Sequence, residues 1–286
     1  MKNLKEIVIH EGVTHVGFGA FAECSSLVSV SIPGTLKVLN DQMFLKCTSL
    51  KTVTLGEGVE TIYVRAFAKC SALESISIPD SVTGISLCAF EKCTSLTKLD
   101  LGNGIKTIVN SAFTDCENLT QINVPSSVEI IGRGAFDGCD KLEYNKYENA
   151  LYLGNEENPY VALVKATSTD INTINIHENT SAIAYYAFKN CENLRKVIIP
   201  EGVKVIGQGT FSNCSSLEDV ELPSTLTEIY SGAFSRCHRL RDIRFHGTKE
   251  QWRAMGEKLH ADWAEGTTFK IIRCSDGVIE ITEEDR

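Results

Sequence analysis

The chain has 286 residues, of which 37 are acidic and 28 are basic, and its formal net charge is -9. Its 23% charged and 43% hydrophobic residues are typical of a folded protein and exclude a disordered acidic tail or a low-complexity scaffold. The acidic balance argues against a general nucleic-acid-binding protein, and every apolar run falls far short of the ~20 residues of a membrane-spanning helix.

A motif of 23 residues recurs from the N-terminus onward and predicts a solenoid in which each copy forms one coil. Phenylalanine recurs every 23 residues from Phe21 to Phe136 and again from Phe188 to Phe234, and a cysteine follows three residues after each of them. A single copy buries too little apolar surface to fold alone, so we expect stacked coils to share a continuous core.

The chain begins inside a coil. Leu4-x-x-Ile7-x-Ile9 is the first predicted strand, and Leu4 lies 23 residues before Leu27. Met1 therefore falls at the position of the repeated cysteine, and the Ala-Phe half of the first coil is missing. We expect the sequence to be a fragment of a longer protein, so the missing signal peptide says nothing about localisation.

One complete copy extends from Val59 to Pro79. Its segment Leu73-x-x-Ile76-x-Ile78 predicts a strand with apolar side chains turned inward. Proline ends the segment because it has no N–H group to donate to a neighbouring strand.

The unit Val-x-x-Ile-Gly-x-x-Ala-Phe-x-x-Cys-x-x-Leu-x-x-Val-x-Ile-Pro is that of the BspA-like leucine-rich repeat family of bacterial and protist surface proteins. Residues 203–223 resemble it closely, with Thr210 in place of the alanine. The resemblance implies a right-handed α/β-type repeat solenoid that is rich in β structure and has a parallel sheet along one face. It also implies a secreted or cell-surface module for adhesion or ligand binding.

The repeat is interrupted between Leu142 and Ile171. The β-prone runs 150–153 and 160–164 flank a turn rich in Gly, Asn and Pro, so they predict an inserted β-hairpin at about residues 143–170. Two interpretations are open: the insert completes the core of one coil, or it projects from the solenoid as a contact element.

The repeat stops after Phe245, so residues 1–245 are predicted to form the solenoid and residues 246–286 its C-terminal cap. Thr248 and Gln251 have the spacing of a capping box and predict a short helix, and Asp276-Gly277 predicts the turn of a hairpin. Trp252 and Trp263 suit either a lid over the last coil, which every solenoid needs, or an exposed platform for a sugar.

The spacing of the eleven cysteines argues against a disulfide scaffold. Nine of them occupy one repeat position, so we expect a column of unpaired, buried thiols that pack as small hydrophobic groups. The zinc-binding spacings Cys-x-x-Cys and His-x-x-x-His are missing, and so are the motifs of nucleophilic catalysis and phosphate binding. We therefore expect no metal, no cofactor and no enzymatic activity.

The outward face of the strands is the candidate binding surface. Serine and threonine occupy its positions in the first coils, and charged and amide side chains replace them later. The simpler interpretation is a solvated face whose charges prevent sheets from pairing. The alternative is a surface that binds a host or matrix protein, or a glycan, through Lys98, Asp100, Gln121, Asn123, Arg195, Lys196, Asp219, Glu221, Arg241 and Arg244.

We expect a monomer without membrane insertion or nucleic-acid binding, whose function is non-catalytic binding at a cell surface. Two other functions remain open. The chain could be a structural spacer in a larger surface protein, or an intracellular scaffold for protein interactions, which unpaired cysteines would tolerate.

Overall fold

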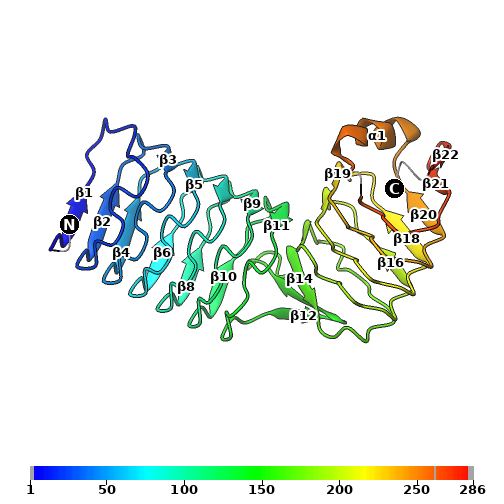
Figure 1. Ribbon diagram of the computed structural model, residues 1–286, viewed down its shortest axis with the longest axis horizontal. Helices are drawn as coiled ribbons and strands as arrows, with labels where there is room; N and C mark the ends of the chain where they lie inside the picture. The colour runs from blue at the N-terminus through cyan, green and yellow to red at the C-terminus, as the bar shows by residue number, and fades with distance from the viewer. Residues whose placement is uncertain (1–2, 261, 283–286) are drawn as a thin grey trace. The chain divides into compact units, whose positions relative to one another are not determined.

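The structure is a computed structural model that describes residues 3–260 and 262–282, and the chain forms two compact units (Figure 1). Unit 1 comprises Met1–Glu143 and Gly154–Glu156, and unit 2 comprises Tyr144–Leu153 and Glu157–Arg286. The predicted division into a solenoid of residues 1–245 and a cap of residues 246–286 stays a prediction.

Unit 1 is a stack of 23-residue coils, and each coil adds one strand to a row of parallel strands (Figure 1). Val30 faces Val53, and Leu99 faces both Ile76 and Ile122, so neighbouring strands are offset by one repeat. The predicted parallel pairing is therefore confirmed, and the row consists of two three-stranded parallel sheets. The strands of the first are β1 (Glu6–Val8), β2 (Ser29–Ile32) and β4 (Thr52–Leu55), and those of the second are β6 (Ser75–Ser77), β8 (Lys98–Asp100) and β10 (Gln121–Asn123).

A second row of parallel strands, which the sequence did not predict, lies in the other half of each coil. Each of its strands has two residues, and the second residue is buried in every coil. Two residues are too few for the alternation of apolar and polar side chains that identifies a strand in a sequence. These strands are β3 (Val38–Leu39), β5 (Thr61–Ile62), β7 (Gly84–Ile85), β9 (Thr107–Ile108) and β11 (Ile130–Ile131).

Unit 2 repeats the same two rows. Its first row contains β16 (Lys196–Ile198), β18 (Asp219–Leu222) and β20 (Asp242–Phe245), continued by β21 (Ile271–Cys274) and β22 (Gly277–Glu280). Strands β20 and β21 are parallel, whereas β21 and β22 form an antiparallel hairpin. Its second row contains β15 (Ala182–Ile183), β17 (Val205–Ile206) and β19 (Glu228–Ile229).

The predicted hairpin of the insert is confirmed and contains one strand more than expected. Strands β12 (Asn145–Tyr147), β13 (Ala150–Leu153) and β14 (Ala162–Ala166) form an antiparallel sheet, and β14 pairs in parallel with β15. The side chains of Tyr152 and Leu163 are fully buried in the core of unit 2. The strands of the insert thus complete the core, as in the first of the two interpretations.

The repeated phenylalanines form stacks in the core of each unit. Neighbouring ring centroids lie 5.2–5.7 Å apart from Phe21 to Phe136, and 5.2–5.3 Å apart from Phe188 to Phe234. The rings are within 16° of parallel. This spacing exceeds the separation of neighbouring strands, about 4.8 Å, because offset rings avoid direct overlap of their electron-rich faces.

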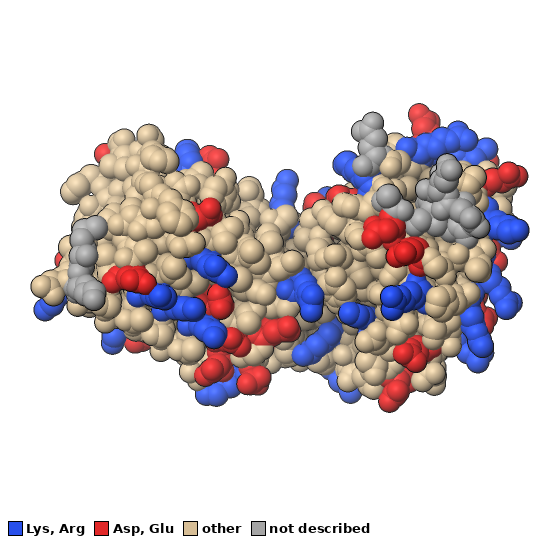
Figure 2. All heavy atoms as spheres, in the orientation of Figure 1, with Lys and Arg blue, Asp and Glu red and all other residues tan. Residues whose placement is uncertain are grey.

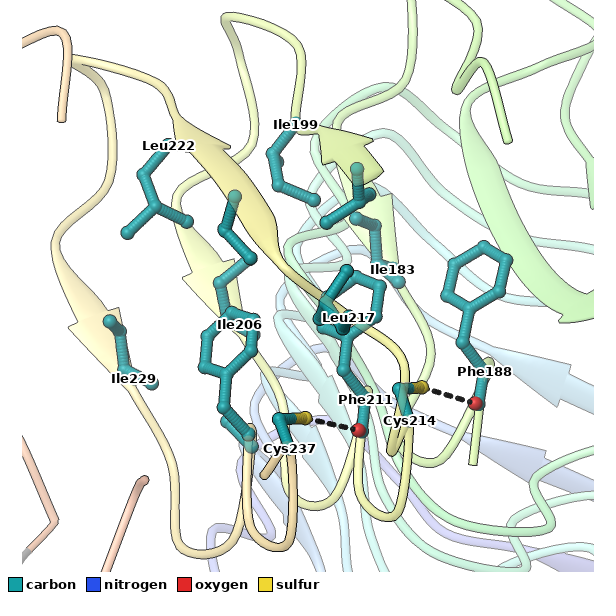
Figure 3. Close-up of a cluster of buried hydrophobic side chains, with 14 of the residues drawn as sticks. Ile183, Phe188, Ile199, Ile206, Phe211, Cys214, Leu217, Leu222, Ile229 and Cys237 are labelled. Carbon is teal, nitrogen blue, oxygen red and sulfur yellow. Dashed lines mark hydrogen bonds between the residues drawn. The ribbon is translucent and has the colours of Figure 1, made fainter. Parts of the chain in front are cut away.

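The repeated cysteines do more than fill space, because their thiols donate hydrogen bonds between coils. Cys214 Sγ donates to the carbonyl oxygen of Phe188, and Cys237 Sγ to that of Phe211, each at 3.2 Å (Figure 3). The same bond, at 3.1–3.2 Å, recurs at five cysteines of unit 1. All eleven cysteines are free thiols in the structure.

Each complete coil holds two residues in the left-handed backbone conformation. One lies two residues before the phenylalanine and the other directly before the cysteine, as in Gln42 (φ +58°) and Lys46 (φ +59°). Glycine occupies the first position in some coils, such as Gly19, but other coils place a side chain there. A non-glycine residue in this conformation is strained by contact between its Cβ atom and the backbone.

The C-terminal cap contains the predicted helix, α1 (Lys249–Ala254), and its capping box is present at Thr248 and Gln251. A short 3₁₀ helix, η1 (Gly256–Lys258), follows. Trp252 and Trp263 are buried, which removes the expected alternative of an exposed sugar platform. The carbonyl oxygen of Trp263 accepts the N–H of Phe234, a role that the alanine of the next coil plays elsewhere.

One detail of the predicted cap is corrected by the structure. The two-residue loop between β21 and β22 consists of Ser275 and Asp276, so Asp276-Gly277 is not the turn pair. Gly277 pairs with Cys274 as the first residue of β22 and has a φ of +139°, which only glycine adopts easily.

Candidate functional site

The predicted binding residues belong to two different units. Lys98, Asp100, Gln121 and Asn123 lie in unit 1, where Lys98 faces Gln121 and Asp100 faces Asn123. All four side chains are exposed, and Asn123 Nδ2 donates to Asp100 Oδ1 at 3.3 Å. The pattern of the repeat therefore places these residues correctly, while their role in binding stays a prediction.

In unit 2 the structure brings three of the predicted residues together around one carboxylate. Glu221 Oε1 lies 2.7 Å from Lys196 Nζ and 3.2 Å from Arg244 Nη1. Strand register explains these contacts. Glu221 on β18 faces Arg244 on β20 directly, whereas Lys196 on β16 is diagonal to Glu221, because it precedes the facing residue Ile198 by two positions. The hydrogen bond from Lys196, together with the charges of Lys196 and Arg244, lowers the pKa of Glu221.

His246 is a fourth member of this group and was not among the predicted binding residues. Its Nε2 lies 3.4 Å from Glu221 Oε2, and its Nδ1 lies 3.8 Å from Glu201 Oε1. The 23-residue spacing places His246 at the end of β20, level with Pro223 after β18. The spacing therefore gives the position of His246, but it does not show that its side chain reaches Glu221. We name Lys196, Glu221, Arg244 and His246 the Glu221 cluster.

Glu201 is held in place by the turn after the next strand. Its carboxylate accepts the N–H and the hydroxyl of Ser224 at 3.0 Å each, and the N–H of Thr225 at 3.3 Å. Burial would raise the pKa of Glu201, but these hydrogen bonds outweigh it and lower the pKa. The carboxylate therefore stays ionised opposite His246 near neutral pH.

The cap adds β21 to the first row of unit 2, and this strand also carries a charged residue of the face. Arg273 on β21 faces Arg244 on β20, and its Nε donates to Asp242 Oδ1 at 2.6 Å. Two cations in neighbouring strands would repel each other, and Glu221 and Asp242 each neutralise one of them. Sequence analysis assigned Arg273 only to the cap because the register of β21 does not follow the 23-residue repeat.

Arg195 and Arg241 flank Glu218 on either side. The N–H of Glu218 donates to the carbonyl oxygen of Arg195, and the N–H of Arg241 donates to that of Glu218. Both arginines are exposed, and within residues 3–260 and 262–282 neither makes an ion pair. Asp219 is likewise exposed on β18. The predicted residues of unit 2 thus form two groups. Lys196, Glu221 and Arg244 pair with one another, whereas Arg195, Asp219 and Arg241 are exposed charged residues.

The charges around Glu221 determine what chemistry this arrangement can support. The part of the chain that the structure describes contains no group of His, Cys, Asp and Glu that could hold a metal ion. The carboxylate of Glu221 is surrounded by cations, which weakens it as a base.

Figure 2 shows basic and acidic side chains interspersed over unit 2, with Lys and Arg prominent along the margin beside α1, β21 and β22. Among the described residues, the helices are too short and too polar for a bilayer span.

Comparison with known proteins identifies the repeat. The model of the BspA type leucine rich repeat region matches six copies, within residues 1–96, 60–156 and 166–255. No curated protein matches the chain.

Several solved structures are similar to the chain. A leucine rich cell surface protein from Faecalibacterium prausnitzii is 26% identical, with 88% of this chain and 90% of that chain covered and a TM-score of 0.41. A leucine-rich repeat protein from Bacteroides ovatus is 21% identical, with coverage of 93% and 92% and a TM-score of 0.40. The pneumococcal vaccine antigen PcpA is 19% identical, with coverage of 99% and 80% and a TM-score of 0.44.

Proposed function

The chain belongs to the BspA-type leucine-rich repeat family, and from this premise we propose that it is a non-catalytic binding module of a cell-surface or secreted protein. The proposed partner is a protein or a glycan, and the proposed contact surface is the exposed face of β16, β18 and β20 with the Glu221 cluster at its centre. The proposal includes a monomeric state and excludes nucleic acid as the partner.

The Glu221 cluster is the observation that carries this proposal. Glu221 is only 15% exposed, whereas Lys196 and Arg244 remain about half exposed on either side of it. Because both cations are about half exposed, solvent screens these ion pairs and limits their contribution to stability, which is about 0–1 kcal/mol for exposed pairs. Most of the same strand positions in unit 1 carry neutral side chains such as Ser77, and Glu6, Lys98 and Asp100 are the charged exceptions.

A fixed charge pattern favours recognition because its geometry is set before the partner arrives. Lys196 and Arg244 are held by Glu221, so binding would cost less side-chain entropy than ordering two free cations. Complementary charge also favours the correct partner over others. Because the face has few aromatic anchors, we expect modest affinity for one copy, with avidity from repeated copies on a surface.

Arrays of extracellular-matrix proteins and of glycans test the proposal. We expect the wild-type chain to bind at least one component, and the variant K196Q/E221Q/R244Q to bind it at least tenfold more weakly with an unchanged circular dichroism spectrum. The matched control T52Q/T54Q changes β4, on the corresponding face of unit 1, and should bind like the wild type. A wild-type chain that binds nothing would support the spacer, and equal binding by the triple variant would place the contact elsewhere.

A further inference from the structure

Arginine is concentrated in the last regular coil of unit 2. The chain has ten arginines, and four of them lie within residues 236–244, although lysine outnumbers arginine in the chain as a whole. Arg244 belongs to the Glu221 cluster, but Arg236, Arg239 and Arg241 are exposed. Within the described ranges 3–260 and 262–282, none of these three makes an ion pair. We name Arg236, Arg239 and Arg241 the arginine triad.

The three arginines follow one another closely along one coil, so their backbone positions lie within the span of one oligosaccharide. Arg241 lies five positions after Arg236, which limits the distance between their Cα atoms to about 18 Å even in an extended chain. The backbone of the coil fixes both ends, because the N–H of Arg236 donates to Glu265 O and that of Arg241 donates to Glu218 O. The backbone of the triad is therefore held at both ends, and its three side chains are exposed to solvent.

Among the described residues, no carboxylate forms an ion pair with the triad. Asp242, next to Arg241, is engaged by Arg273 at 2.6 Å. Glu218 and Asp219 lie one coil away on the row of β18, and within the described ranges neither forms an ion pair with the triad. Residues 236–244 thus carry four arginines and one engaged aspartate, and this local excess of positive charge contrasts with the net charge of -9 of the chain.

The chemistry of the triad selects anionic groups with several oxygen atoms. A guanidinium group is planar and offers paired N–H donors that match two oxygens of a sulfate or carboxylate. Residues 236–246 expose no large hydrophobic side chain, and the exposed ones described in unit 2 are Ile198 and Val278. Hot spots of protein interfaces combine arginine with the aromatic anchors Trp and Tyr, which this surface lacks, so it suits a charged polymer that needs no such anchors.

We propose that the arginine triad binds an anionic polysaccharide, whose sulfate or carboxylate groups pair with Arg236, Arg239 and Arg241. This inference rests on the proposed binding function and names a partner class for the margin of the same face. Because the attraction is mainly electrostatic and solvent-exposed, affinity should fall steeply as salt increases.

Titration calorimetry with defined oligosaccharides at low salt tests the inference. We expect a heparin octasaccharide, which is sulfated, or an oligogalacturonate, which carries only carboxylates, to bind, and neutral dextran not to bind. The variant R236Q/R239Q/R241Q should bind at least tenfold more weakly. The matched control K46Q/K69Q/K92Q removes three charges at the repeat position of Arg236 in unit 1 and should change affinity less than twofold.

The two triple variants separate this inference from the proposed function. An anionic oligosaccharide that loses affinity only in K196Q/E221Q/R244Q would refute the triad and leave the binding function standing. The inference also fails if neither oligosaccharide binds, if the lysine control weakens binding equally, or if poly-glutamate or single-stranded DNA of equal charge binds more tightly. Melting temperatures within a few degrees of the wild type confirm that each variant is folded.

Discussion

The thiol of Cys214 donates a hydrogen bond to the carbonyl oxygen of Phe188 in the preceding coil, with an Sγ–O distance of 3.2 Å. The same oxygen accepts the N–H of Cys191 at 3.1 Å within its own coil. One carbonyl therefore joins two coils, and the repeated cysteine supplies the donor that an alanine of similar size would lack.

We expect the variant C214A to lose about 1–2 kcal/mol of stability, because it removes the donor and leaves a small cavity beside the phenylalanine stack. The variant C214S keeps a donor and should lose less. Urea unfolding followed by tryptophan fluorescence measures both, since Trp252 and Trp263 are buried in unit 2. A serine variant as unstable as the alanine variant would show that the hydrogen bond is unimportant.

The buried thiols also predict a loss of stability in alkali. Burial raises the pKa of Cys93 and Cys237 to about 12, from 9.0 for an exposed thiol. These thiols stabilise the fold fully below pH 9. Above it the unfolded chain loses protons that the folded chain keeps, so stability falls until the pH passes the folded pKa.

Each such thiol should lower the free energy of unfolding by about 1.4 kcal/mol for every pH unit above pH 9. Urea midpoints at pH 8, 9 and 10 measure the effect, and the range below pH 10 limits the contribution of tyrosine. The variant C237S removes one titrating group and should show a shallower decline. Equal midpoints at pH 8 and pH 10 would contradict the buried column of ionisable thiols.

Alkylation should distinguish the two cysteines outside the column from the other nine. Cys88 and Cys274 are partly exposed, whereas the column is buried. We expect mass spectrometry to find at most these two labelled by iodoacetamide in the folded protein at pH 8, and all eleven labelled after denaturation without a reductant. Labels missing after denaturation would show disulfides and contradict the free thiols.

The repeat made most of the fold predictable, because a fixed spacing of 23 residues places equivalent side chains in register. Leu99 had to face Ile76 and Ile122 once the coils were stacked. The capping box at Thr248 was equally predictable, since its chemistry is local. The second strand row was not, because its strands are too short to carry a periodic signal.

The candidate site was predictable only in part, because strand register can be read from the repeat but the reach of long side chains cannot. Lys196, Glu221 and Arg244 were placed on one face, yet the contact of His246 with Glu221 depends on how two side chains bend toward each other. Arg273 joins the site through the pairing of β21, whose register the repeat does not set.

Residues other than glycine that adopt the left-handed backbone conformation are sites where a glycine substitution should stabilise the protein. Gln42 has a φ of +58° at the repeat position that glycine occupies in Gly19. The variant Q42G should gain about 0.5–1 kcal/mol, because relief of strain outweighs the greater entropy of glycine in the unfolded chain. Thermal melts followed by circular dichroism measure it. The control Q42A keeps the strain and should gain nothing, and a destabilised Q42G would contradict the argument.

A final prediction concerns glycines that share one repeat position but differ in their neighbours. A Cβ atom at Gly207 would overlap the ring of Tyr185, whereas one at Gly17 would meet nothing within 4 Å. Neither residue has a positive φ, so space and not backbone strain should decide the outcome. We expect G207A to be destabilised by about 1–3 kcal/mol and G17A by less than about 0.5 kcal/mol.

The double variant Y185A/G207A tests the cause directly. Removal of the ring leaves room for the new methyl group, so the loss in the double variant should be smaller than the sum of the two single losses. Urea unfolding followed by tryptophan fluorescence measures all three variants in unit 2. Additive losses would show that Gly207 is required for a reason other than its contact with Tyr185, since the ring would then have no influence on the cost of the methyl group.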